Sequence, residues 1–592
     1  MASQSEPLPE RELDSVRMTL LVWAGAALAY LAAVLVLGQE PYDGDDLMRL
    51  QQVRDLMAGQ GWFDVTQYRM NPPTGVAMHW SRLVDLPLVA VMIVLRIVLP
   101  QALAESWAAM LVPLFYLGAA LLLLRAIMLR LGFVGWQVLA GLGLAALFPL
   151  VPAAFAPMRI DHHSPQAVAA LAMAALMLRA PSRQAALLGG LVGAVWLVIS
   201  LEGLPVIAFV AGLYGLRYAL VRDRSLAWFL GALALAAPLL SLATRPMSEF
   251  ALWCDVLLPA HWAAFAAAAV AAGALSYLPR QDRLVGRVLA MGLLPLLSAP
   301  VAMAMIGPCL SGPLAALDPL VRSYWYNHVY EGLPIWMQPP SLALPALYTL
   351  ALVTAGLWAA RREGLLRDEA RLKWLLHALL ALGVACYGLL LLREILVAQL
   401  LAVPFALALL IRFMPRARAL TATIPRVLAT MACVLLVTPA GAAIAGKQIG
   451  QRSLPSDHFA SQPRQHAAGL APCDFADLQR LGEGYVFTSF NSAPEILAHT
   501  SLGVTTGGYH RNVEALHRVI SAFIADTGEA RAIVKQSGAN YLAICLEDDS
   551  LVIFAEDRPE SLARALLLGE RVDWLDPVSG FENTQLRVYR VR

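Results

Sequence analysis

The feature that most constrains this chain is a succession of apolar runs, each close to the length that crosses a lipid bilayer. A helix that spans the hydrocarbon core needs roughly 20 predominantly apolar residues. Of the 592 residues, 59 % are apolar and 15 % are charged, whereas a soluble protein carries about 25 % charged residues. We therefore expect a mainly α, polytopic membrane bundle of about thirteen spans, at about 18–38, 104–124, 135–156, 164–178, 185–201, 204–220, 225–244, 259–278, 287–307, 341–360, 374–392, 395–411 and 427–446.

The balance of charge excludes two other classes of protein. The chain has 44 Lys+Arg and 42 Asp+Glu, a net charge of +2, which is too balanced for a protein that binds nucleic acid. Intrinsic disorder needs low hydrophobicity and high net charge, and neither is present. The six Cys include no Cys-x-x-Cys pair, so the sequence gives no sign of a cysteine metal site.

Arginine predicts the orientation, because Lys and Arg collect in cytoplasmic loops. Alternate short loops are rich in Arg only if the apolar run 83–99, which contains Asp85, Pro87 and Arg96, does not cross the membrane. We expect that run to be an interfacial or half-inserted helix. We expect a protein of the cytoplasmic (inner) membrane with three parts. They are a cytoplasmic tail at 1–17, a transmembrane domain at 18–446 with outer loops 39–103, 157–163 and 308–340, and an extracytoplasmic domain at 447–592.

The last 145 or so residues have more charge and shorter apolar runs. Runs at 484–490, 503–509 and 541–545 predict strands, and 512–527 and 559–568 predict helices, which together indicate a small α/β domain. Cys473 and Cys545 both fall in it. An oxidising compartment permits a disulfide between them, and two unpaired thiols are the alternative.

The first outer loop carries three acidic residues just after the first span, Asp43, Asp45 and Asp46. Asp is favoured as a helix N-cap, which accounts for one of them, so we expect a functional role for at least one other. The residues that follow, 47–57, have helical periodicity and predict a helix lying on the membrane surface.

The second outer loop contains Asp161, His162 and His163 between two apolar runs. Capping by Asp and a hydrogen bond from His would be a structural explanation. An Asp-x-His pair is also a reasonable fragment of a divalent-metal site, of a kind that suits Mn²⁺, Mg²⁺ or Zn²⁺ better than Ca²⁺.

Isolated charges mark the remaining outer positions. Glu331 lies in an aromatic-rich third loop, and Glu202 and Arg393 lie at outer span ends in otherwise apolar stretches. Ionisable residues close to the membrane are functional candidates by default. For Arg393 we expect a phosphate contact, and for Glu202 the sequence suggests no specific role.

This layout resembles the catalytic subunit of oligosaccharyltransferases, a family of type C membrane glycosyltransferases with an outward C-terminal domain. Asp46, followed by Leu-Met-Arg-Leu-Gln-Gln-Val-Arg, is similar to the family's catalytic Asp in the first outer loop, and Asp161-His-His163 resembles its second acidic motif in the Asp-x-His form. Glu331 is similar in place to a late-loop glutamate, and Arg393 to the arginine that faces the donor phosphate. The family's Trp-Trp-Asp motif, which reads an acceptor peptide, is absent, and its nearest counterpart is the segment 488–495.

The resemblance implies an inverting, metal-assisted glycosyltransferase that moves a sugar or glycan from a polyprenyl-phosphate or -diphosphate donor at the outer face of the membrane. The implied cation is Mg²⁺ or Mn²⁺, with Zn²⁺ as the alternative, and the acceptor is a glycan, a lipid or a protein. The resemblance implies Asp46, Asp161 and Glu331 for catalysis, Asp46, Asp161 and His163 for the metal, and Arg393 for the donor phosphate. From the residues alone we add Arg159 as a second cation for the phosphate and, as further candidates, Asp43, Asp45, His162, His79, Tyr509 and His510.

A transporter or flippase of lipid-linked glycans is the alternative to an enzyme. Transporters place their polar residues near the bilayer midplane, often in repeated halves. Here the polar clusters lie at outer span ends and no two-half repeat is evident, which favours the enzyme. A non-catalytic sensor or assembly subunit would not need acidic clusters in two separate outer loops.

Overall fold

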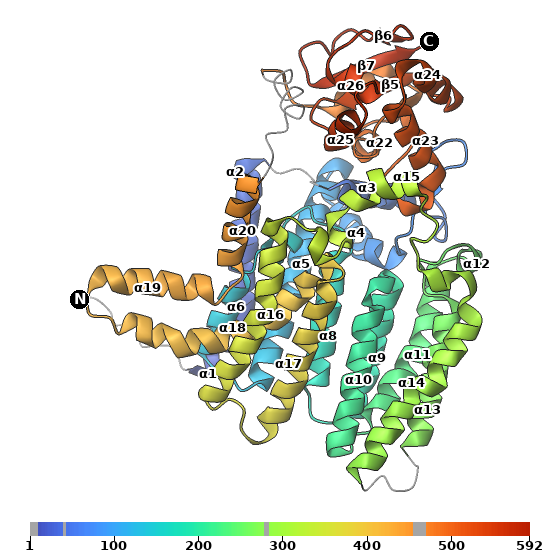
Figure 1. Ribbon diagram of the computed structural model, residues 1–592. Coiled ribbons are helices and arrows are strands. Elements are labelled where there is room, and N and C mark those ends of the chain that lie inside the picture. Colours follow the sequence, from blue (N-terminus) through green and yellow to red (C-terminus); the bar gives the residue numbers. More distant parts are fainter. Residues whose placement is uncertain (1–9, 39–42, 277–282, 454–468) are drawn as a thin grey trace. The chain divides into compact units, whose positions relative to one another are not determined.

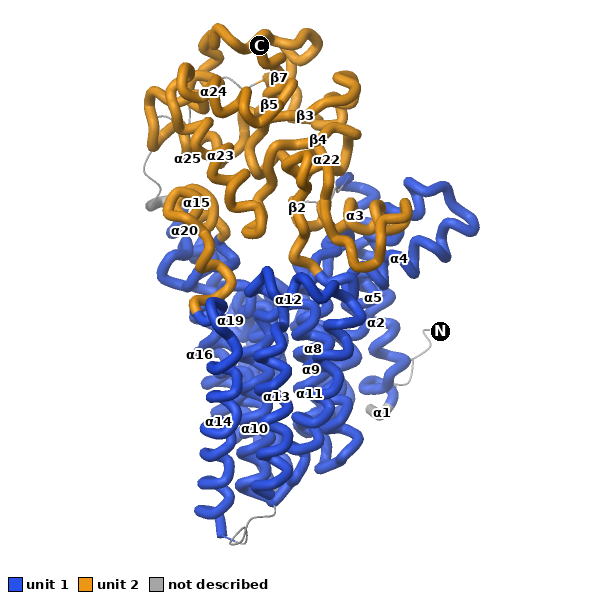
Figure 2. Tube along the Cα trace, turned by 90° about the vertical axis from the view of Figure 1, so that its right-hand side faces the viewer, with its two compact units in different colours: residues 1–40, 81–310, 330–453 blue, residues 41–80, 311–329, 454–592 orange. Residues whose placement is uncertain are grey.

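The computed structural model describes residues 10–38, 43–276, 283–453 and 469–592. The chain divides into two units, which are described separately (Figure 2). Unit 1 contains 1–40, 81–310 and 330–453, and unit 2 contains 41–80, 311–329 and 454–592. The first outer loop and half of the late outer loop therefore belong to the same unit as the C-terminal residues.

Unit 1 is a bundle of apolar helices that lie side by side (Figure 1). One large core cluster joins these helices, and many of their remaining apolar side chains are exposed, as expected for a surface that faces lipid. The principal helices are α2 (Val16–Leu37), α5 (Gln101–Arg130), α6 (Trp136–Ala145), α8 (His163–Met177), α9 (Arg183–Ile199), α10 (Leu204–Val221), α11 (Ser225–Thr244), α13 (Pro259–Leu275), α14 (Leu284–Ile306), α16 (Pro340–Arg362), α17 (Asp368–Gly388), α18 (Ile395–Arg418), α19 (Thr423–Leu436) and α20 (Ala440–Ser453). The prediction of a multi-pass membrane protein is confirmed.

Counting helices that are long enough to cross a membrane gives fewer spans than counting apolar runs in the sequence. Within the described residues, eight helices are long and apolar enough to cross a membrane, or nine if α19 and α20, which are bent by 83°, form one span. Helix α8 has 15 residues and α9 has 17, lengths of about 22–26 Å at 1.5 Å per residue. A hydropathy run does not show where a helix ends, so the count of thirteen stays a prediction.

The apolar run after the first outer loop forms α4 (Arg82–Leu95), a helix of 14 residues with Pro87 inside it. Its length, about 21 Å, is less than the roughly 30 Å thickness of the hydrocarbon core. This length agrees with a helix that does not cross the membrane, and the orientation that depends on it remains a prediction.

Unit 2 contains a five-stranded mixed sheet of order β4-β3-β5-β7-β6. Strand β3 is parallel to β4 and β5, and β7 is antiparallel to β5 and β6. The predicted α/β domain is confirmed, although the predicted strands at 484–490 and 503–509 are several residues too long. The elements are β3 (Tyr485–Phe487), α22 (Ala493–His499), β4 (Gly503–Val504), α23 (Val513–Ile524), α24 (Thr527–Gln536), β5 (Tyr541–Cys545), α25 (Asp549–Asp557), α26 (Leu562–Leu567), β6 (Leu575–Pro577) and β7 (Leu586–Val591).

The first outer loop is joined to this sheet by its backbone. Asn71 N–H donates to the carbonyl of Val504 at 2.8 Å, and Val504 N–H donates to the carbonyl of Arg69 at 2.8 Å. The loop therefore pairs alongside the edge strand β4. The Arg69 guanidinium also donates to three carbonyl oxygens at and just beyond the C-terminal end of α22, those of Leu497, Thr500 and Leu502. Helix C-termini leave carbonyls unsatisfied, and Arg69 supplies their donors.

Two disulfides hold loops together. Cys473 and Cys545, which the sequence left as either a disulfide or two unpaired thiols, form a disulfide within unit 2. Cys254–Cys309 was not anticipated; it joins the loop after α12 (Glu249–Leu252) to the one-turn helix η2 (Gly307–Ser311) in unit 1. Disulfides persist in oxidising compartments, so both bridges favour the extracytoplasmic side for these loops, as the arginine pattern does.

Thiol labelling tests both bridges. Denatured, unreduced protein should incorporate two maleimides, on Cys386 and Cys433, because these two of the six cysteines are free. After reduction all six should react, as counted by intact mass. Cys254→Ser should add one label without reduction, at Cys309. Six labels on the unreduced wild type would contradict the pairing.

Candidate functional site

The second outer loop places three potential ligands together at the start of α8. Within the described residues, Asp161, His162 and His163 each offer a ligand atom, and these atoms all lie within 4.8 Å of one another. Asp161 and His162 are 6 % and 7 % exposed. The Asp161 carboxylate accepts from the His162 ring at one oxygen and lies 3.3 Å from His163 Nε2 at the other. The two imidazole rings are 4.5 Å apart.

Local contacts fix this turn. Met158 has a positive φ of 74°, and its N–H donates to the carbonyl of Ala109 in α5 at 3.0 Å. Ser164 Oγ donates to the carbonyl of Ala154 at 2.6 Å, and Gln166 Oε1 accepts from Trp196 Nε1 of α9 at 2.9 Å. The start of α8 is thus held against three neighbouring segments, and this support positions Asp161 and His163.

Two further charges of unit 1 join the group. His163 Nε2 lies 3.4 Å from Glu331 Oε2, and Arg393 Nη2 lies 3.2 Å from Glu331 Oε1. Glu331 lies in the short helix η4 (Tyr330–Gly332) and Arg393 in η6 (Leu392–Glu394). The structure therefore brings together four predicted site residues, Asp161, His163, Glu331 and Arg393, from loops that are far apart in the sequence.

The Arg393 guanidinium continues the series of charges to Glu202. Arg393 Nη1 donates to Glu202 Oε1 at 2.7 Å, and Glu202 lies in η1 (Leu201–Gly203), just before α10. The sequence singled out both residues as isolated charges but did not pair them. The five residues Asp161, His163, Glu331, Arg393 and Glu202, called the charged cluster below, alternate between acidic and basic groups.

The electrostatics of Glu331 follow from this setting. Burial alone would raise the pKa of Glu331, but the charge of Arg393 and the hydrogen bond from His163 outweigh it, so its pKa lies well below the usual value. Glu331 is therefore an anion at physiological pH. It can bind a cation or hold a cationic side chain, but it has no proton to donate.

The donor set fits a divalent metal. Ligands to one ion at about 2.0–2.6 Å lie within roughly 5 Å of one another, and Asp161, His162 and His163 meet this condition. A carboxylate with imidazoles suits Mn²⁺ or Zn²⁺ better than Mg²⁺, which prefers oxygen ligands. His162, which the sequence gave only as a further candidate, thus joins the ligand group.

The other predicted residues lie in the first outer loop and the C-terminal part of unit 2. Helix α3 (Gly44–Met57) begins after the N-cap Asp43, which accepts from the N–H of Asp45, so one of the three acidic residues is a cap as expected. Asp46 is fully buried in the first turn of the helix. Because Asp46 belongs to unit 2 and Asp161 and His163 to unit 1, their meeting around one cation stays a prediction.

Helix α3 differs from the amphipathic surface helix that the sequence predicted. Its buried residues include the polar Arg49, Gln51 and Gln52 as well as the apolar ones. Helix α3 packs against α22, and Arg54 donates to the carbonyl of Ala498 at 2.7 Å. The periodicity located the helix, but it could not show that protein covers its polar side too.

An aromatic group in unit 2 contains three of the further candidates. The His79 ring lies 4.7 Å from the His510 ring and 6.3 Å from the Tyr509 ring. Tyr509 also meets Trp80 edge-on at 5.5 Å, and Arg49 lies over Trp80 at 4.6 Å. The segment that begins at Gly507 therefore packs on the first outer loop. Arg159, the second candidate for the donor phosphate, is half-buried in the loop before Asp161.

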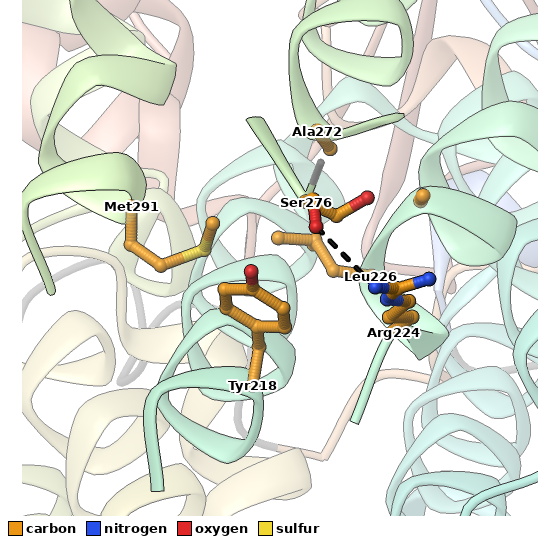
Figure 3. Close-up of a pocket in the computed structure, with 7 residues that line it drawn as sticks. Tyr218, Arg224, Leu226, Ala272, Ser276 and Met291 are labelled. Atoms are coloured by element: carbon orange, nitrogen blue, oxygen red, sulfur yellow. Dashed lines mark hydrogen bonds between the residues drawn. The ribbon is translucent and has the colours of Figure 1, made fainter. Parts of the chain in front are cut away.

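A small, open pocket lies elsewhere, at the opposite end of α10 from Glu202. In Figure 3, Arg224 Nη2 donates to the carbonyl of Ser276 at 3.5 Å beside Tyr218. The lining contains no carboxylate or imidazole. It is therefore separate from the charged cluster and lacks the groups that a metal or a general base would require.

Comparison with known proteins shows the fold. No family model and no curated protein matches the sequence. The structure is similar to that of the archaeal oligosaccharyltransferase AglB from Archaeoglobus fulgidus in complex with an inhibitory peptide and a dolichol-phosphate, with a TM-score of 0.62, 13 % identity, and coverage of 95 % of this chain and 72 % of that one. The same enzyme in complex with Zn and sulfate gives a TM-score of 0.57 and 13 % identity, over 96 % of this chain and 73 % of that one. The chain thus has the fold of a type C membrane glycosyltransferase.

Metal binding tests the ligand group directly. Purified wild-type protein should bind Mn²⁺, and Asp161→Asn should weaken binding at least about tenfold because an amide is a poor ligand for a divalent cation. The free Mn²⁺ signal in electron paramagnetic resonance gives the dissociation constant. Asp526→Asn, a change at a helix N-cap in unit 2, is the matched control. Equal affinity in all three proteins would remove the assignment.

Proposed function

We propose that this protein is an integral membrane glycosyltransferase. It moves a sugar or glycan from a polyprenyl-phosphate or -diphosphate donor to an acceptor at the outer face of the cytoplasmic membrane. The observation that carries the proposal is the charged cluster, which joins a potential metal group to an arginine at the ends of membrane helices. The solved structure of similar fold that contains a dolichol-phosphate supports a lipid-linked donor.

The donor phosphate binds at Arg393 in this proposal. Arg393 lies in η6, where α18 begins, so a donor that enters from the lipid meets it at the membrane boundary. A planar guanidinium matches two phosphate oxygens at once. Negative charge grows on the phosphate as the glycosidic bond breaks, and fixed cationic groups stabilise that charge. Arg159 is the second cationic candidate.

The metal group supplies further charge stabilisation. Asp161, His162 and His163, with Asp46 as predicted from the sequence, would hold a divalent cation, which acts as a Lewis acid toward the leaving phosphate. The cation is Mn²⁺, Mg²⁺ or Zn²⁺. Glu331 remains ionised, holds Arg393 and His163 through its two oxygens, and so orients both.

Asp46 is the proposed general base. It lies in the first turn of α3. Its carboxylate would accept the proton of an acceptor hydroxyl or amide, a contribution of about 10²–10⁴ in rate. Attack opposite the departing phosphate inverts the anomeric carbon. The C-terminal residues 447–592 are proposed to lie outside the cytoplasm and to bear on the acceptor, which is a glycan, a lipid or a protein.

Substitution of Arg393 tests the role of the arginine. Arg393→Lys keeps the charge but loses the bidentate geometry, so turnover of a lipid-linked sugar should fall at least about tenfold, and Arg393→Ala should reduce it further. Arg412→Lys is the control, since Arg412 is paired with a glutamate, Glu363, at 2.9 Å, outside the charged cluster. Wild-type turnover in both Arg393 variants would show that the phosphate binds elsewhere.

A further inference from the structure

Glu202 is held by its backbone at the edge of the charged cluster. Its N–H donates to Ser200 Oγ at 3.4 Å, and its carbonyl accepts from Tyr387 Oη at 3.3 Å. Its side chain accepts from Arg393 Nη1 through Oε1 at 2.7 Å. The other oxygen, Oε2, is buried and accepts no hydrogen bond from any residue that the structure describes. Only one of the two carboxylate oxygens of Glu202 therefore takes part in the ion pair.

The buried Arg217–Asp223 pair of the same unit shows what a structural ion pair looks like. Asp223 accepts from Arg217 at one oxygen, and from the N–H and Oγ of Ser225 at the other, at 3.0 and 2.7 Å. Both carboxylate oxygens are satisfied, as expected for a pair that holds helices together. Glu202 lacks this second set of donors, so its pairing with Arg393 is a weaker one.

A second carboxylate lies beside the pair. Glu394, 3 % exposed at the start of α18, interacts electrostatically with both Glu202 and Arg393. Its Oε2 is buried and has no hydrogen-bond partner among the described residues. Arg393 is thus surrounded by three carboxylates, those of Glu202, Glu331 and Glu394, so Glu202 is not the only group that can neutralise it.

The two terminal nitrogens of Arg393 are each bound by a different carboxylate. Nη1 is bound by Glu202 at 2.7 Å and Nη2 by Glu331 at 3.2 Å. A phosphate that binds Nη1 must compete with Glu202 for that nitrogen, whereas the contact of Glu331 with Nη2 can hold the guanidinium in place. The side chains of Arg393 and Glu202 are 18 % and 28 % exposed, so a ligand can reach the pair.

We infer that Glu202 is a built-in competing anion, which occupies Arg393 in the absence of the lipid phosphate and is displaced when that phosphate binds. The inference rests on the proposed function, in which Arg393 binds the donor phosphate. Glu202 is thus a positioning residue that sets the affinity for polyprenyl phosphate. It also assists release of the product lipid phosphate, because its carboxylate returns to Arg393 as the phosphate leaves.

The experiment measures binding of undecaprenyl phosphate to purified full-length protein in detergent. Glu202→Gln keeps an oxygen that can accept from Arg393 but removes the competing charge, so the dissociation constant should fall about tenfold. Glu202→Asp keeps the charge but is one methylene shorter, so it should also tighten binding, and it serves if the glutamine variant does not fold. Glu363→Gln, which changes the Arg412 pair, should bind as wild type.

The outcomes separate this inference from the proposed function. If wild type binds and Arg393→Ala does not, but Glu202→Gln binds no more tightly than wild type, the competing-anion role is wrong and the phosphate site stands. Weaker binding by Glu202→Gln would mean that Glu202 supports phosphate binding, and would also overturn the inference. If wild type and Arg393→Ala bind equally, the phosphate site and the inference fall together.

Discussion

Mutual neutralisation of charges at the ends of membrane helices is the interaction on which the site depends. The charged cluster runs from Asp161 through His163, Glu331 and Arg393 to Glu202, with contacts of 3.3, 3.4, 3.2 and 2.7 Å. An unpaired ion is costly near the bilayer, so removal of one member of the cluster would leave its partner uncompensated. The pairs therefore fix α8, η4, η6 and η1 relative to one another, and they bring together the residues that we propose bind a cation and a phosphate.

The proposed chemistry is divided between the two units. The residues proposed to meet the donor lie in unit 1, whereas Asp46, the proposed base, lies in unit 2 with the first outer loop. Arg69 and the backbone pairing with Val504 attach that loop to the C-terminal sheet. Unit 2 therefore contains both the proposed base and the C-terminal residues that we propose contact the acceptor. The Trp-Trp-Asp motif, which reads an acceptor peptide in oligosaccharyltransferases, is absent from the sequence.

The sequence predicted the class of fold and individual charges better than it predicted their partners. Arg393 and Glu202 stood out as lone charges in apolar stretches, but they are 191 residues apart, and no periodicity relates them. Glu394 was not expected to pair with Arg393, because adjacent residues of a helix do not face each other. His162 was ranked below His163 because only His163 completes the Asp-x-His pair with Asp161, yet the turn before α8 brings both rings together. Helix ends and disulfide pairing, as in Cys254–Cys309, depend on tertiary contacts that hydropathy does not contain.

The central claim is that this chain breaks a glycosidic bond to a lipid phosphate. Mass spectrometry of the lipid fraction, after incubation of purified protein with a polyprenyl-linked sugar, its acceptor and a divalent cation, tests the claim most directly. We expect free polyprenyl phosphate or diphosphate to accumulate as the lipid-linked sugar disappears, with wild type but not with Asp161→Ala. A lipid-linked sugar that keeps its full mass while the protein, reconstituted in vesicles, moves it across the membrane would contradict the account and indicate a flippase.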